Sequence, residues 1–364
     1  MFGFPSRKLH PLQTPHSGYQ WDSRRTYFFE GWYFRVTLPE PGITFAFMYS
    51  IQDPIGGQFR SGGVAQVLGP ADTYIWRTLP NPQLFWAWSE GLGLGHWRQP
   101  LRDQVPQFLP PHQFSDRIVE GYQATTSWHQ GCLQEPTGQH TVTWQYQTEP
   151  VYGWGNPQQP QQATAGWLSD WSVFEPGWQV LMAHGHATGW IEWQKTRYNF
   201  TRAPAYCEKN WGRAFPHRWF WLQCNAFNQV SDLSLTAVGA DRQRQRHPDR
   251  VALVGLHHQN QFYEFVPWNA TFTWQVYAWG DWYLRAERFN YIVEIKATAN
   301  RPGVKLRTPD EEGMVYRCRH TTQGQIHLNL WHKQEGNLTL QLTATSHQAA
   351  LEVGGDPWIG PWCS

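Results

Sequence analysis

The sequence predicts a mainly antiparallel β protein that consists of two similar units in tandem. Aromatic residues make up 16% of the chain, with 24 Trp, and charged residues make up only 16%. Another 32 Gly and 26 Pro interrupt the chain frequently. Large side chains between closely spaced turns favour short strands over long helices.

Strands are indicated by side chains that alternate between two faces along the chain. Residues 28–38 place Glu30 in an apolar row with Trp32 and Phe34, while Tyr33 belongs to the other row. The same alternation recurs at 141–147, 326–331 and 338–346. Turn signals rich in Gly and Pro separate such segments at 39–42, 53–57, 300–303 and 334–337. A period of two is the pattern of strands with two different faces.

Two segments share one plan, which suggests the domain organisation. Residues 28–50 and 218–240 each hold an aromatic strand, a short connection and a second strand. We therefore expect an N-terminal β domain over 1–203 and a C-terminal β domain over 204–364. The Gln/Pro-rich residues 156–166 are expected to form an exposed loop within the first domain.

Composition also restricts the function classes. With 29 Lys+Arg and 28 Asp+Glu the formal net charge is +1, which favours neither nucleic acid nor acidic lipid as a partner. The chain has no apolar stretch of about 18 residues and no recognisable leader, so a cytoplasmic location is expected. Residues 241–250 hold four arginines, expected as a solvated hairpin tip or as a membrane contact.

Glu30 is the first candidate for chemistry. A carboxyl group among tryptophan and phenylalanine side chains would be desolvated, which raises its pKa and favours the protonated acid. Such a group can donate a proton. The alternative is an ion pair with Arg24 or Arg25, and the sequence leaves both interpretations open.

Residues 204–225 (PAYCEKNWGRAFPHRWFWLQCN) present the same question again. In an extended chain Tyr206, Glu208 and Asn210 share one face, and Lys209 and Trp211 share the other. The charged residues are expected either as a turn or as polar anchors for a ligand on an apolar wall. The following strand would add Trp219, Trp221, Gln223 and Asn225 to one face.

Other motifs carry weaker signals. His184 and His186 would share a strand face, and His257 and His258 could join them, but no carboxylate or cysteine lies beside them at metal-ligand spacing. We expect no metal site. Residues 91–96 (GLGLGH) lack the spacing of a dinucleotide site and are expected in a turn region. Paired carboxylates in a Trp-rich sugar cleft stay open as an alternative.

Eight segments, in one order from residue 14 to the C-terminus, resemble the tocopherol cyclase family. They are TPHSGY (14–19), FFEGWYFRV (28–36), FMYS (47–50), PVYGWG (150–155), TGWIEW (188–193), EKNWG (208–212), FVPWN (265–269) and GGDPWIGPW (354–362). Plastid members carry a targeting extension that is missing here, so the chain resembles a cyanobacterial form.

The resemblance implies two lipocalin-like antiparallel β-barrel units in tandem. It also implies cyclisation of a prenylated (phytylated) benzoquinol to a chromanol without cofactor or metal, at a thylakoid or other internal membrane that the protein contacts peripherally. Ring closure requires a proton on an alkene and attack by a phenolic oxygen, in a site from which water is excluded. Indole faces can stabilise the cation.

The expected site residues follow from combining that chemistry with the strand faces. Glu30 or Glu208 is the expected acid, with Asp22 in reserve, and Lys209 and Asn210 are expected beside it. Substrate contacts are expected from His16, Tyr19, Trp32, Tyr49, Tyr206, Trp211, Trp219, Trp221, Gln223 and Asn225. The alternatives are a lipocalin-like prenyl-lipid carrier without catalysis and an isoprenoid hydratase of the same superfamily.

Overall fold

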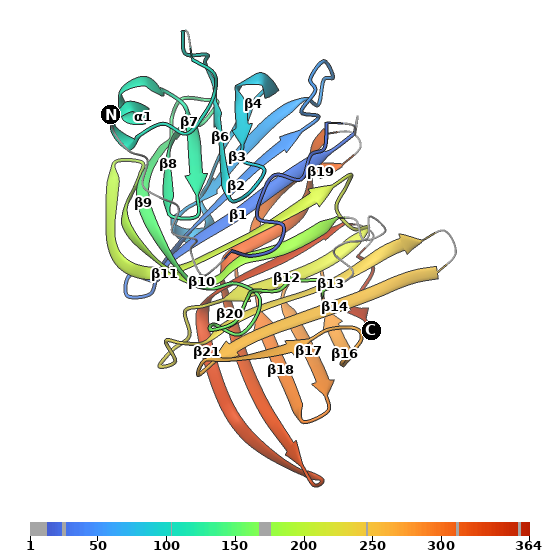
Figure 1. The fold of residues 1–364 in the computed structure, drawn as a ribbon. Helices are drawn as coiled ribbons and strands as arrows, with labels where there is room; N and C mark the ends of the chain where they lie inside the picture. The colour runs from blue at the N-terminus through green and yellow to red at the C-terminus, as the bar shows by residue number, and fades with distance from the viewer. Residues whose placement is uncertain are drawn as a thin grey trace.

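The chain folds almost entirely into antiparallel strands, arranged in two large curled sheets (Figure 1). A computed structural model describes residues 13–23, 27–102, 104–166, 176–244, 247–310, 313–355 and 358–364. Within these ranges helix is confined to α1 (Pro111–Arg117) and the 3-10 turns η1 (Pro70–Asp72) and η2 (Pro82–Leu84). The predicted fold class, mainly antiparallel β with two similar units, is confirmed.

The first sheet has eleven strands in the order β4-β3-β2-β1-β11-β10-β9-β8-β7-β6-β5. Their bounds are β1 (Phe29–Leu38), β2 (Ile43–Gln52), β3 (Gly62–Leu68), β4 (Tyr74–Leu79), β5 (Phe85–Ala87), β6 (Gly93–Trp97), β7 (Gly121–Thr125), β8 (Trp128–Gln134), β9 (Thr141–Tyr152), β10 (Gly177–Trp193) and β11 (Thr196–Gly212). Of residues 91–96, expected in a turn region, 91 and 92 lie in the bend between β5 and β6, and the rest belong to β6. There Gly93 and Gly95 leave room for the rings of Trp88 and Trp86.

The second sheet follows the order β15-β14-β13-β12-β21-β20-β18-β17-β16-β22, with β19 paired to β20. Its strands are β12 (Arg218–Cys224), β13 (Ser234–Arg244), β14 (His247–His258), β15 (Gln261–Phe265), β16 (Thr271–Val276), β17 (Asp281–Arg288), β18 (Tyr291–Thr298), β19 (Val304–Asp310), β20 (Gly313–Gln334), β21 (Asn337–Gly355) and β22 (Trp362–Cys363). The arginine-rich segment forms the end of the β13–β14 hairpin, and its residues 245 and 246 lie outside the described chain.

The two sheets repeat one plan. In the first, β1 lies between β2 and β11; in the second, β12 lies between β13 and β21. The similarity between 28–50 and 218–240 therefore reflects equivalent positions in the two units. The chain passes from one sheet to the other at residues 213–217, so the expected boundary at 203/204 falls inside β11.

Each sheet buries one face in a hydrophobic core of its own, and the two sheets also pack against each other. Trp32 and Phe34 belong to the first core and Phe220 to the second. Tyr33 and Trp221 belong to a third cluster, which lies between the sheets. Because alternate residues of β1 point to opposite faces, the strand is buried on both sides and serves two cores.

Polar side chains also connect the two sheets across their interface, which we call the seam. Arg35 on β1 donates to Gln223 Oε1 at 2.5 Å and to the carbonyl of Gln348 on the second sheet. Gln66 on β3 exchanges two 3.0 Å hydrogen bonds with the backbone of Arg307 on β19. Side-chain to backbone bonds of this kind satisfy buried polar groups where no strand ladder is present.

Candidate active site

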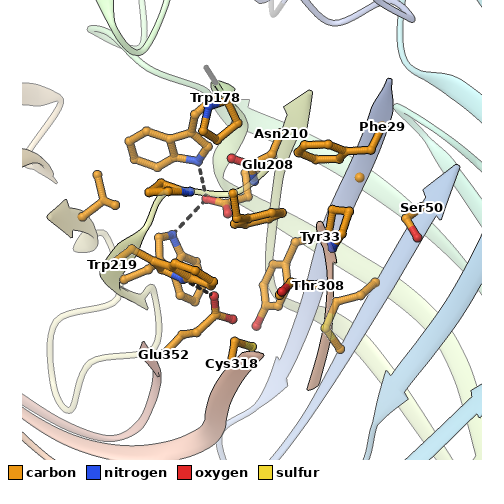
Figure 2. A pocket seen from close by; sticks show the side chains of 18 of the residues that line it. Phe29, Tyr33, Ser50, Trp178, Glu208, Asn210, Trp219, Thr308, Cys318 and Glu352 are labelled. Carbon is orange, nitrogen blue, oxygen red and sulfur yellow. Dashed lines mark hydrogen bonds between the residues drawn. The ribbon is translucent and has the colours of Figure 1, made fainter. Parts of the chain in front are cut away.

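The candidate site is a cavity of about 200 Å³ between the two sheets, lined by side chains from both of them (Figure 2). Most of its wall is aromatic or aliphatic. Its lining includes Phe29, Tyr33, Met48, Trp178, Glu208, Asn210, Phe215, Trp219, Trp221, Leu306, Met314, Cys318 and Glu352. Among the described lining residues, Glu208 and Glu352 are the two carboxylates. A mainly apolar cavity with a few converging polar groups is typical of a ligand site.

Glu208 reaches the cavity because of the register of β11 against β1. Glu208 lies opposite Tyr33, and both point to the seam. Its Oε2 accepts hydrogen bonds from Tyr206 Oη at 2.6 Å, Trp178 Nε1 at 3.0 Å and Trp221 Nε1 at 3.0 Å. Two of these are drawn in Figure 2. Its other oxygen, Oε1, takes part in none of these three hydrogen bonds.

The proton affinity of Glu208 suits acid catalysis near neutral pH. Burial raises the pKa of Glu208 to about 7; the three donors oppose this shift, and the nearby Glu352 adds to it. At neutral pH the protonated and ionised forms are thus similarly populated. Since Oε2 already accepts three hydrogen bonds, the proton is carried by Oε1.

Glu352 was not expected from the sequence. It lies on β21 opposite Trp221, and its Oε1 accepts a 2.8 Å hydrogen bond from Trp219 Nε1. Its Oε2 is 3.0 Å from Nδ1 of the buried His320, whose Nε2 lies 3.4 Å from the hydroxyl of Tyr33. These contacts form a continuous chain of polar groups from the second sheet to the first.

Glu30 and Lys209, expected at the site, form a buried pair on the opposite face of β1 and β11. Lys209 Nζ is 2.6 Å from Glu30 Oε1 and 2.5 Å from the carbonyl of Gly18, and both side chains are fully buried. The backbone N–H of Gln20 donates to Glu30 Oε2 at 2.8 Å. The ion-pair alternative for Glu30 is therefore observed, with Lys209 as partner; Arg24 and Arg25 lie outside the described residues.

The structure brings together four more of the expected site residues. Asn210, Trp219 and Trp221 line the cavity, and Tyr206 lies behind Glu208 as a hydrogen-bond donor. The predicted face shared by Tyr206, Glu208 and Asn210 is confirmed by the strand register.

Two further residues border the cavity, and two others serve the seam. Trp32 and Tyr49 contribute to the lining, although their rings pack into the core of the first sheet. Gln223 follows Trp221 on β12, and Asn225 lies directly after the strand. Gln223 accepts from Arg35 and Asn225 donates to the carbonyl of residue 205, so they hold the sheets together rather than face a ligand.

The remaining expected residues lie apart from the cavity lining. Trp211 shares the face of Lys209, whose Nζ is 5.0 Å from the centre of the indole, and His16 packs against the same indole. Tyr19 packs against Trp32 at the first core. Asp22 is exposed to solvent. Strand alternation explains the position of Trp211, because a shift of one residue changes the face. His16, Tyr19 and Asp22 precede β1 and belong to no strand.

The sequence did not point to three residues of the site, which are Trp178, His320 and Glu352. Glu352 in the run AALEVGG is an acidic residue within an apolar strand, which is the same signal that pointed to Glu30. The histidines at 184 and 257 pack against Tyr152. The residues placed by the structure include no cluster of three or more metal-ligating side chains.

Two curled sheets that line an indole-walled cavity with a readily protonated carboxyl group define a lipocalin-like protein equipped for acid chemistry on an apolar ligand. The chain belongs to the tocopherol cyclase-like family, whose sequence model matches residues 26–355.

Relatives at the sequence level support the same assignment. The chain is 42% identical over 386 residues to "Probable tocopherol cyclase, chloroplastic" of Oryza sativa subsp. japonica, covering 98% of this chain and 82% of the relative. It is also 42% identical over 390 residues to "Tocopherol cyclase, chloroplastic" of Zea mays, covering 98% and 81%. The names of both relatives thus place those proteins in chloroplasts.

A solved structure shares the fold. The crystal structure of CghA with Sch210972 superposes with a TM-score of 0.50 at 9% identity, covering 91% of this chain and 89% of the other. Identity this low shows the architecture alone.

Proposed function

We propose that the protein is a tocopherol cyclase that closes the chromanol ring of a phytylated benzoquinol. Family membership and 42% identity to two tocopherol cyclases support this activity. The structural observation that carries the proposal is Glu208, a buried carboxyl group with a pKa of about 7 that lines an aromatic cavity.

The first step is protonation of the prenyl double bond by Glu208. The proton moves from Oε1 to the less substituted alkene carbon, and the positive charge develops on the tertiary carbon. The ionised Glu208 that remains is stabilised by Tyr206, Trp178 and Trp221, which already donate to Oε2. Donors fixed in place before the reaction need no rearrangement as the charge develops.

The cavity wall protects the cation from water. Trp178, Trp219 and Trp221 present indoles around the two carboxylates, and aliphatic residues such as Leu306 continue the wall. An indole face stabilises a desolvated cation by about 2 kcal/mol. A phenolic oxygen held against the cation then closes the ring before water enters.

A bilayer contact would supply the membrane-dissolved substrate. Phe59 and Ile55 are 84% and 52% exposed on the β2–β3 connection. The neighbouring Arg60 approaches Gly313, next to Met314 in the cavity lining. Exposed apolar side chains beside a ligand cavity suit insertion into a lipid surface. The described part of the chain has no helix long and apolar enough to span a bilayer. The cytoplasmic, membrane-peripheral location stays a prediction.

The test is to incubate the purified protein with a phytylated benzoquinol, a reductant and a chelator, and to identify products by mass and chirality. One enantiomer of the chromanol is expected. Recovery of unchanged, bound quinol would instead indicate a carrier, and a tertiary alcohol would indicate a hydratase.

The variant Glu208→Gln is expected to lower ring closure by at least about 100-fold, the usual contribution of a general acid. Glu264→Gln is the matched control. Glu264 also accepts a 2.8 Å hydrogen bond from an indole, that of Trp154, but it is not among the lining residues of the cavity. Equal activity of the two folded variants would exclude Glu208 as the acid.

A further inference from the structure

The cavity contains a second carboxylate that protonation of the alkene does not use. Glu352 enters the cavity from β21 on the second sheet, whereas Glu208 enters from β11 on the first. Ring closure delivers one proton to carbon and removes another from the phenolic oxygen, and a carboxylate other than the acid can accept the second proton. Among the described lining residues, Glu352 is the remaining carboxylate.

We propose that Glu352 is the base that accepts the proton of the attacking quinol hydroxyl, and that His320 and Tyr33 position it. This inference rests on the proposed cyclase function. It assigns the removal of the phenolic proton to a residue of the second sheet.

The contacts of Glu352 suit a base. One oxygen accepts from Trp219 Nε1 at 2.8 Å and the other from His320 Nδ1 at 3.0 Å, and the Cys318 side chain also bonds to the carboxylate. A carboxylate has about four lone-pair sites, so it keeps capacity for a further hydrogen bond. With its proton on Nδ1, His320 offers Nε2 as the acceptor for the Tyr33 hydroxyl at 3.4 Å. His320 orients the carboxylate of Glu352, much as the third residue of a catalytic triad orients the base.

Tyr33 links the two carboxylates structurally. It lies opposite Glu208 in the β1–β11 ladder, and its hydroxyl reaches His320 on β20. Its ring also packs against Trp221, with centroids 5.2 Å apart. The spacing between acid and base is therefore set by a residue that contacts both sheets.

The proton balance of the cycle closes. Glu208 loses a proton as a C–H bond forms, the C–O bond forms at the tertiary carbon, and the phenolic proton passes to Glu352. No oxidant, reductant or second substrate is consumed. The cycle is complete when Glu352 has given up this proton and Glu208, with a pKa of about 7, has taken one up.

The two roles are separable in D₂O. Wild-type protein is expected to give chromanol with one deuterium on the former alkene carbon. Glu352→Gln is expected to lower chromanol formation by about 100-fold or more. In this variant the substrate cation, once formed, loses a proton from carbon instead of closing the ring. The recovered quinol therefore carries carbon-bound deuterium or a shifted double bond. Glu208→Gln is expected to lose both chromanol and deuterium incorporation.

Three outcomes would overturn the inference. Glu352→Gln could form chromanol at the wild-type rate, or it could lose deuterium incorporation together with chromanol, as Glu208→Gln does. A second variant, His320→Gln, leaves the carboxylate of Glu352 in place and is expected to lower chromanol formation more than deuterium incorporation. Equal losses of chromanol and of deuterium incorporation would overturn the positioning role of His320. Glu264→Gln is the control, and circular dichroism checks that each variant is folded. Absence of chromanol from wild-type protein would refute the cyclase function itself.

Discussion

Removal of the Tyr206 hydroxyl should move the pH dependence of the reaction upward. Tyr206 donates to Glu208 Oε2 at 2.6 Å and is not among the cavity-lining residues, so Tyr206→Phe changes the acid without changing the wall. The hydrogen bond favours the ionised carboxylate, and its loss therefore raises the pKa of Glu208.

The magnitude follows from hydrogen-bond energies. A hydrogen bond to a charged group contributes about 1.5 kcal/mol or more, and 1.36 kcal/mol corresponds to one pKa unit. With a pKa of about 7 in the wild type, kcat/KM should fall tenfold per pH unit above neutrality, because the acid must be protonated. In Tyr206→Phe the onset of that fall should lie about one pH unit higher.

The assay is the initial rate of chromanol formation at low substrate concentration from about pH 5.5 to about pH 9.5, which reports the free enzyme. Tyr152→Phe is the control, since that seam hydroxyl donates to the carbonyl of Asp232 instead. A wild-type profile without a fall above neutral pH, or an identical fall in Tyr206→Phe, would refute the role of Glu208.

Three further predictions concern stability and cavity shape. Lys209→Met should lower the free energy of unfolding by about 3–5 kcal/mol by leaving Glu30 charged and unpaired, whereas a Glu30→Met/Lys209→Met double variant should regain most of it in urea titrations. As the pH rises from 4.5 through 7, the wild-type protein should lose up to about 3 kcal/mol of unfolding free energy relative to Glu208→Gln. The reason is that the raised pKa of Glu208 stabilises the protonated folded state, and this stabilisation is lost as the carboxyl group ionises. The same pH dependence of the unfolding free energy in both proteins would contradict this. Gly354→Ala should lower activity and alter tryptophan fluorescence, because the added Cβ would lie 2.0 Å from the Trp219 ring, and unchanged kinetics would contradict the placement of that indole.

Alternation along single strands made part of the site predictable. The faces of β1 and β11 could be assigned by counting, which placed Glu208 with Tyr206 and separated it from Lys209. Counting could not determine which face bounds a cavity, because β1 is buried on both sides. The more apolar row, that of Glu30, turned out to serve the core of the first sheet.

The rest depended on pairings between segments far apart in the chain. Glu352 meets Trp221 across a ladder that joins β12 to β21, and His320 reaches Tyr33 across 287 residues. Contacts between two sheets leave no local period in a sequence, so the second carboxylate could only be flagged as an acid in an apolar run. Glu208 was identified because its aromatic neighbours lie close to it in sequence.

The burial of β1 and β12 on both faces has a consequence for how this protein can change. Along each of these strands, one set of alternate residues packs into the core of its own sheet, and the other set lies in the seam. Substitutions in the seam can reshape the ligand cavity while each sheet keeps its own core, and substitutions in a core can adjust stability while the acid and base stay in place. Specificity and stability could therefore evolve in alternate positions of the same strand.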